Sequence, residues 1–107
     1  MVFYELRQYK VLPGQMDDWL QIMEKEIIPF QVSKGMGISG SFRGEEDDSV
    51  YVWIRRFESE KQRETLYDAV YGSIEWTEGI SPRLNDVLDR KAMVVTRLTP
   101  TQMSILR

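Results

Sequence analysis

The stretch YVWIRRF, residues 51–57, constrains the fold most, because neither side of it is suited to water. In a β-strand, successive side chains point to opposite faces. One side then carries Val52, Ile54 and Arg56, and the other carries Tyr51, Trp53, Arg55 and Phe57. The aliphatic side suits a covering helix, but the side with three rings and a guanidinium group needs cover as well. The stretch therefore predicts a sheet that is covered on both faces.

The rest of the chain provides a β-α-β-β-α-β series of elements. Four segments rich in β-branched and aromatic residues are predicted strands, at residues 2–11, 36–44, 51–57 and 91–98. Helices are predicted within residues 13–35, from the Ser59 cap to Gly72, and from Ser81, with a hairpin loop at the acidic run 45–48. Pro29 lacks the amide that would bond to the carbonyl of Lys25, so we expect a kink or an early end of the first helix there.

This order of elements is typical of a ferredoxin-like fold. With 107 residues the chain is predicted to form a single α+β domain over residues 1–107. In such a domain both main helices cover one face of a four-stranded antiparallel sheet, and the other face stays open. The sequence therefore leaves one face of the sheet to be covered from outside.

We expect a second copy of the chain to cover the open face. If Val52 and Ile54 lie under the helices, then the ring-bearing side of the strand projects outward, and soluble monomers rarely expose several hundred Å² of apolar surface. Covering such a surface, at ~25 cal/mol per Å², is worth several kcal/mol. The first strand agrees if Leu6 lies under the helices. The prediction is a homodimeric α+β barrel.

Such a dimer would enclose a cavity with a polar constellation. The candidate ligand-binding residues are Glu5, Arg7, Tyr9, Trp53 and Arg55. The two arginines can receive a carboxylate or enolate in a bidentate manner, Tyr9 can donate to negative charge, and Trp53 can form a wall. Glu5 beside guanidinium groups stays ionised and is a weak base. The alternative interpretation is a buried ion-pair network that fixes the dimer or the strand register, with the aromatic rings as interface core.

Composition excludes several classes of site. The chain has no cysteine and no histidine, which removes disulfides, thiolate nucleophiles, His-ligated metals and Ser-His-Asp triads. We therefore expect no metal and no cofactor; haem bound through a tyrosine stays open as a weaker alternative. The acidic run at 45–48 lacks the ligand spacing of a calcium loop. The net charge of -3, with both signs mixed, makes nucleic acid an unexpected partner.

The cellular location expected from the sequence is the cytoplasm. No run of residues approaches the ~20 apolar residues of a membrane span. The first ten residues, MVFYELRQYK, carry charges where a signal peptide would be apolar. We therefore expect no membrane insertion.

Several segments resemble the NIPSNAP family. They are YELRQYKVLPGQMDDWLQIM at residues 4–23, YVWIRRFES at residues 51–59, Trp76, and LTPTQMS at residues 98–104. The resemblance covers nearly the whole chain and implies a ferredoxin-like fold and a dimeric α+β barrel. Its superfamily includes monooxygenases, isomerases, dehydratases and stress-response haem proteins, so it implies no single chemistry. Animal members are associated with mitochondria and with vesicle or autophagy partners, whereas a short single-domain chain is similar to bacterial members.

Two hypotheses of function follow. The first is a cofactor-independent enzyme or binder of a small, oxygenated or carboxylated organic molecule in the dimer cavity. The second is a non-enzymatic scaffold that recruits another protein and whose barrel interior is filled by side chains. Trp76 is either a lid over the cavity or a hydrophobic plug.

Overall fold

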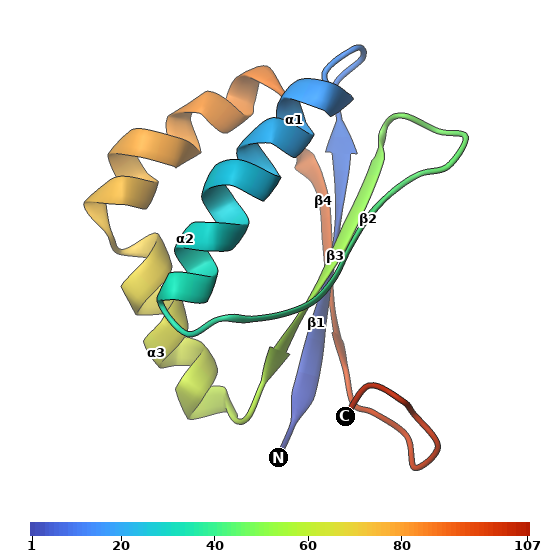
Figure 1. Ribbon diagram of the computed structural model, residues 1–107, viewed down its shortest axis with the longest axis vertical. Helices are drawn as coiled ribbons and strands as arrows, with labels where there is room; N and C mark the ends of the chain where they lie inside the picture. Colours follow the sequence, from blue (N-terminus) through green and yellow to red (C-terminus); the bar gives the residue numbers. More distant parts are fainter.

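The chain folds as one antiparallel sheet with all of its helices on one side (Figure 1). The computed structural model describes residues 1–107. The strands are β1 (Phe3–Val11), β2 (Gly37–Arg43), β3 (Val50–Phe57) and β4 (Leu88–Leu98). They lie in the order β2-β3-β1-β4, and each neighbouring pair is antiparallel. This order confirms the predicted α+β, ferredoxin-like arrangement.

The first helical segment runs without a break from Met16 to Ser33. It consists of α1 (Met16–Ile22), a π-helical segment η1 (Met23–Ile27) and α2 (Ile28–Ser33). Pro29 lies in the first turn of α2, directly after the π-helical residues. Pro29 therefore follows a local change of helix type and does not end the helix. The wider π-helical turn before it accommodates a residue that has no amide hydrogen to donate.

The second helical segment begins at the predicted cap. The Gln62 amide donates to Ser59 Oγ (3.1 Å), and the Gln62 side chain accepts from the Glu58 amide (2.6 Å). Helix α3 (Glu60–Tyr71) is followed by a π-helical segment η2 (Glu75–Ile80) and a 3-10 helix η3 (Ser81–Asp86). The sequence did not predict η2, and β4 begins at Leu88 instead of residue 91.

The predicted orientation of β3 is wrong. Tyr51, Trp53, Arg55 and Phe57 are at most 1% exposed and lie beneath the helices, whereas Val52 and Ile54 are half-buried on the opposite face. The helices supply aromatic neighbours for the rings and hydrogen-bond partners for Arg55, which the aliphatic side does not require. The rings are covered and Arg55 is hydrogen-bonded by residues of the same chain. This face therefore does not need a second subunit to cover it.

Strand β1 is inverted in the same way. Glu5, Arg7 and Tyr9 pair in register with Arg55, Trp53 and Tyr51 and share their inward-facing side. Leu6, which was expected under the helices, lies opposite Ile54 on the outer face. The sequence analysis therefore placed the correct residues of β1 and β3 on a common face, but it assigned that face to the side away from the helices.

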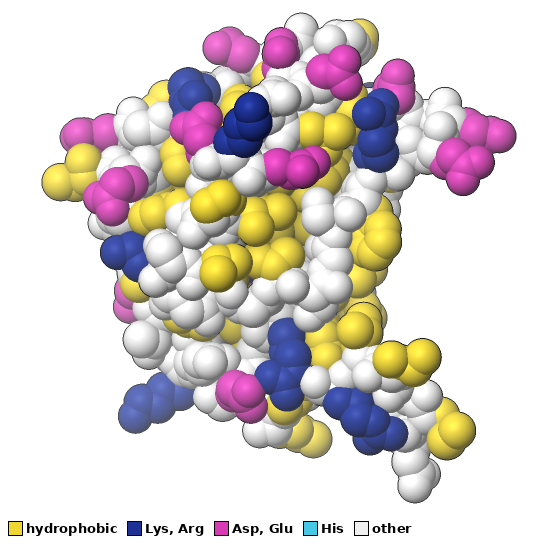
Figure 2. All heavy atoms as spheres, in the orientation of Figure 1, with side chains coloured by type: hydrophobic (Ala, Val, Ile, Leu, Met, Phe, Trp, Pro, Cys, Tyr) yellow, Lys and Arg dark blue, Asp and Glu magenta, His cyan; other side chains and the backbone are white.

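The face of the sheet that points away from the helices carries a cluster of apolar side chains. We call outer sheet patch the apolar side chains on this face, which are Leu6, Phe42, Val52, Ile54, Val94 and Leu98; the polar Gln8, Arg56 and Thr96 share the face with them. Phe42 is 57%, Val94 55% and Leu98 41% exposed. Figure 2 shows hydrophobic side chains along the hollow between the β2–β3 hairpin and the C-terminal segment. No helix in the structure has both the length and the apolar character needed to span a membrane.

Candidate functional site

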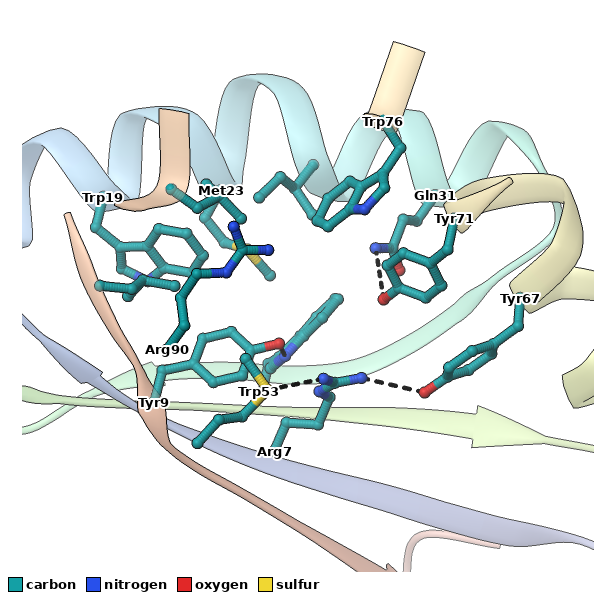
Figure 3. Close-up of a pocket in the computed structure, with 14 residues that line it drawn as sticks. Arg7, Tyr9, Trp19, Met23, Gln31, Trp53, Tyr67, Tyr71, Trp76 and Arg90 are labelled. Carbon is teal, nitrogen blue, oxygen red and sulfur yellow. Dashed lines mark hydrogen bonds between the residues drawn. The ribbon is translucent and has the colours of Figure 1, made fainter. Parts of the chain in front are cut away.

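A cavity of about 400 Å³ lies between the helices and the inner face of the sheet (Figure 3). Its aromatic lining is Tyr9, Trp19, Trp53, Tyr67, Tyr71 and Trp76. Its other side chains are Arg7, Met23, Ile27, Gln31, Leu84, Leu88, Arg90 and Met93. The volume lies within the range of pockets that hold small molecules. The cavity belongs to one chain, so the expectation that it forms between two subunits is corrected.

The aromatic rings form the walls through edge contacts. Trp19 packs edge-on against Tyr9 at 5.7 Å and against Tyr51 at 5.4 Å between ring centroids. Tyr71 and Trp76 meet edge-on at 4.9 Å. The positions follow from the helical spacing of Trp19 and Met23 on the first helical segment and of Tyr67 and Tyr71 on α3, since residues four apart share one face. These rings form the aromatic part of the cavity lining.

Arg55 is fully buried behind this wall and its charge is compensated within the chain. Its Nη1 donates to Gln31 Oε1 (3.0 Å) and to Tyr71 OH (2.7 Å). Its Nη2 donates to Glu5 Oε1 and to Tyr67 OH. The guanidinium carbon also lies 4.7 Å from the centroid of the Trp53 ring. Both of its terminal nitrogens are therefore fully engaged with protein partners.

Glu5 is the carboxylate that several arginines share. Its Oε1 accepts from Arg55 and from Tyr67 OH (2.6 Å), and its Oε2 accepts from Arg63 Nε (3.0 Å). Burial opposes ionisation of Glu5, but the Tyr67 hydrogen bond, the charge and hydrogen bond of Arg55 and the hydrogen bond of Arg63 outweigh it and lower its pKa to about 2. Glu5 is thus a fixed anion near neutral pH and not a general base.

Arg7 has the weakest set of partners among these arginines. Its Nη1 donates to Tyr67 OH (3.1 Å) and its Nη2 to the Met93 thioether sulfur (2.9 Å), while its Nε has no partner. The nearest carboxylate oxygen, Glu5 Oε1, lies 3.5 Å away and is already shared with Arg55. A thioether is a weak acceptor. Arg7, with its side chain 14% exposed at the cavity, is therefore a cation with unused donor capacity.

The polar groups that line the cavity are mainly donors. The lining contains no aspartate, glutamate, histidine or lysine. Burial raises the pKa of Tyr9 and raises that of Tyr67 to about 12, so both phenols keep their protons near neutral pH. Arg90 donates to the backbone carbonyl (2.9 Å) and the hydroxyl (3.0 Å) of Ser81. A ligand that supplies acceptors or negative charge fits this lining.

The structure brings the five predicted site residues together. Arg7, Tyr9 and Trp53 line the cavity, whereas Glu5 and Arg55 lie behind its wall and hold other residues in place. The sequence did not single out Tyr67 and Tyr71 for this site, although their spacing of four residues on a predicted helix places them on one face. Trp76 lines the cavity from η2.

The acidic run between β2 and β3 forms a hairpin tip. Asp47 Oδ1 accepts from the amide (2.9 Å) and the hydroxyl (2.7 Å) of Ser49, as in an Asx turn. The structure contains no group of three or more acidic side chains arranged to hold a metal ion. The run is therefore part of the turn.

Comparisons with known proteins place residues 4–104 of the chain in one family. The NIPSNAP family model matches residues 4–104. A NIPSNAP family protein from Agrobacterium tumefaciens is similar in structure, with a TM-score of 0.88, 22% sequence identity, and 100% of both chains covered. A second protein from that organism, a NIPSNAP family protein with unknown function, has a TM-score of 0.88, 24% identity, and 99% and 94% coverage of this chain and its own.

A more distant structure supports the same fold. An uncharacterized NIPSNAP domain protein from Burkholderia xenovorans has a TM-score of 0.83 and 16% identity, covering 95% of this chain and 97% of its own. Among curated proteins, none matches the chain. The match of the family model over residues 4–104 covers nearly the whole length, as the sequence segments had indicated. The chain therefore belongs to the NIPSNAP family.

Proposed function

We propose that the cavity binds a small organic anion without a metal or cofactor, with Arg7 at the charged end and the aromatic rings around the rest of the ligand. The observation that carries this proposal is the environment of Arg7. It is a guanidinium group at the wall of an apolar cavity, and its closest partners are a phenol and a thioether. A buried cation without a full counter-charge favours an anionic partner.

The local charge supports the same ligand class. Around Glu5 the structure gathers the guanidinium groups of Arg7, Arg55 and Arg63, and of these only Arg63 has a second carboxylate partner, Glu60. Arg55 and Arg63 donate directly to Glu5. The surplus positive charge is therefore nearest to the cavity at Arg7. An anion bound there would be stabilised in a site of low polarity.

Binding is favoured over turnover by the lack of a base. General acid-base catalysis needs a group whose pKa lies near the working pH. Glu5 has its pKa lowered to about 2 and Tyr67 has its pKa raised to about 12. A reaction at this site would therefore depend on stabilising an anion that forms within the ligand itself.

The scaffold hypothesis has one supporting observation. The rings of Trp19, Tyr9 and Tyr51 interlock and fill the inner face at one end of the cavity. The remaining volume of about 400 Å³ is nevertheless large enough for a small ligand. A ligand binder is therefore the better-supported candidate.

A thermal-shift comparison of carboxylates with their amides tests ligand binding. We expect 2-naphthoate at millimolar concentration to raise the melting temperature, because a ligand that binds only the folded state stabilises it by mass action. The neutral 2-naphthamide, matched in shape, should give a smaller shift because it does not neutralise Arg7. If a broad panel of small carboxylates, aliphatic and aromatic, leaves the melting temperature unchanged, the proposed function is wrong.

We also propose that the chain forms a homodimer through the outer sheet patch. The patch is apolar and no helix covers it, and Figure 2 shows hydrophobic side chains in a hollow between two projecting segments. An uncovered apolar sheet face of this kind is typical of an interface. The dimer would then lie on the opposite side of the sheet from the ligand cavity, which the helices cover.

The substitution Ile54→Lys should separate the two subunits. A lysine in the centre of the outer sheet patch would place a charge in the apolar interface, which strongly disfavours association. The control is Val32→Lys, because Val32 is 52% exposed on α2, away from the sheet. In sedimentation at micromolar concentration we expect the wild type and Val32→Lys at twice the 12.6 kDa of one chain, and Ile54→Lys at a single chain mass. A wild type that sediments as a single chain would refute the dimer.

A further inference from the structure

We infer that Tyr71 is a second ligand-binding donor in this cavity and that, together with Arg7 and Tyr9, it selects planar, conjugated carboxylates. This inference rests on the proposed function and deepens it, because it names the ligand class and a residue that determines specificity.

The Tyr71 hydroxyl is an acceptor toward the protein on both of its lone pairs. It accepts from Arg55 Nη1 (2.7 Å) and from Gln31 Nε2 (3.4 Å). The orientation of the Gln31 amide is fixed, because its Oε1 accepts from the same Arg55 Nη1 (3.0 Å) and a flipped amide would bring two donors together. No protein group accepts the hydrogen of the Tyr71 hydroxyl. That hydrogen is free for a ligand.

Tyr67 provides the contrast on the same helix. Its hydroxyl also accepts from Arg55 and in addition from Arg7 (3.1 Å), but it donates its own hydrogen to Glu5 Oε1 (2.6 Å). Both tyrosines line the cavity and lie four residues apart on α3. They thus differ in one property that matters for a ligand, which is whether the hydroxyl hydrogen is already used.

Tyr9 adds a second free hydroxyl from the sheet. It accepts from Trp53 Nε1 (2.9 Å), and no protein group accepts its hydrogen. Figure 3 shows the Tyr9 and Tyr71 hydroxyls pointing inward from the sheet and helix sides of the cavity, with Arg7 beside them on the floor. Two hydroxyl donors and a guanidinium group around one volume suit the several lone pairs of a carboxylate.

The walls favour a conjugated ligand. The rings of Tyr71 and Trp76 stand at 83° to each other, so the cavity presents a ring face next to a ring edge. Aromatic pairs in edge or offset geometry gain affinity beyond the area that they bury, and a saturated ring lacks this gain. A conjugated carboxylate therefore uses both the donors and the walls.

Isothermal titration with three matched probes tests the inference. The probes are 2-naphthoate, its saturated analogue decahydro-2-naphthoate, and neutral 2-naphthamide, each titrated into the wild type, Tyr71→Phe and Tyr51→Phe. We expect the wild type to bind 2-naphthoate at least threefold more tightly than the saturated acid. Tyr71→Phe should weaken 2-naphthoate binding about tenfold. Tyr51→Phe should weaken it less than threefold, because the Tyr51 hydroxyl bonds to Ser41 Oγ (2.6 Å) and does not line the cavity. Thermal melts of both variants verify that they are folded.

The outcomes separate this inference from the proposed function. If no acid binds to the wild type, the proposed function fails. If both acids bind the wild type equally well, or if Tyr71→Phe binds 2-naphthoate as tightly as the wild type does, then the inference is overturned while anion binding stands. A loss in Tyr71→Phe that is the same for the acid and for the amide would also overturn it, since Tyr71 would then not distinguish the carboxylate from a neutral acceptor.

Discussion

Glu5→Ala is expected to lower the free energy of unfolding by about 3–5 kcal/mol, the usual cost of removing one partner from a buried ion pair. Glu5 and Arg55 are both fully buried, and Arg55 would keep its charge without a counter-ion after the substitution. Chemical denaturation of the wild type and the variant measures the difference. The expected value is a large part of the stability of a domain of this size.

An exposed glutamate provides the control for this prediction. Glu60 forms ion pairs with Arg63 and Arg97, but its side chain is 49% exposed. Glu60→Ala should therefore lower the free energy of unfolding by less than about 1 kcal/mol. Equal losses for the two variants would show that the Glu5 network does not organise the inner face.

The pH dependence of stability gives a second readout of Glu5. Its pKa in the folded chain, about 2, lies below the value of 4.5 for an unperturbed group, so the folded state binds this proton less readily than the unfolded state does. The stability that Glu5 contributes is therefore present above about pH 4.5 and is lost as the pH falls toward 2. We expect Glu5→Gln to lose less stability than the wild type between pH 6 and pH 2.5, because it has no proton to take up there.

Arg7→Met is expected to weaken binding of 2-naphthoate by about thirtyfold or more. Loss of one partner of a desolvated charge pair at a binding site costs about 2 kcal/mol or more, which corresponds to a factor of about thirty. Methionine keeps much of the volume of the side chain, so the cavity should stay closed on this side. Isothermal titration of the wild type and the variant measures the ratio.

Arg63→Met is the matched control for Arg7. Arg63 also contacts Glu5, through Nε at 3.0 Å, but it does not line the cavity. Its substitution should change 2-naphthoate affinity by less than about threefold while it lowers stability. If Arg63→Met and Arg7→Met reduce affinity equally, the anion responds to the general positive charge of the cluster and not to a contact with Arg7.

Local signals in the sequence were sufficient for the elements and their order. The Ser59 cap with Gln62 and the Pro13-Gly14 break were interpreted correctly, since both depend on the chemistry of a few neighbouring residues. The residues of β1 and β3 that share a face were also grouped correctly, because polar and aromatic residues alternate with aliphatic ones in both strands. These features do not require knowledge of distant contacts.

The facing of the sheet could not be derived from β3 alone. Both of its sides are suited to burial, and the choice depends on partners that come from other elements. Arg55 lies inside because Gln31, Tyr67 and Tyr71 of two separate helices supply hydrogen-bond acceptors for it. The sequence interpretation placed the aliphatic Val52 and Ile54 under the helices, and this left Arg55 on the outward face. The alternation of side chains along β3 defines its two faces. Hydrogen-bond partners for Arg55 from distant parts of the chain determine which face lies under the helices.

The central claim is that Arg7 receives an organic anion inside the cavity. A crystal structure of the chain grown with 2-naphthoate tests it most directly. We expect the carboxylate within hydrogen-bonding distance of the Arg7 guanidinium group, and the ring system between the aromatic walls that Tyr71 and Trp76 help to form. A carboxylate that lies outside the cavity, or a cavity occupied by the rings with the carboxylate turned away from Arg7, would contradict the claim.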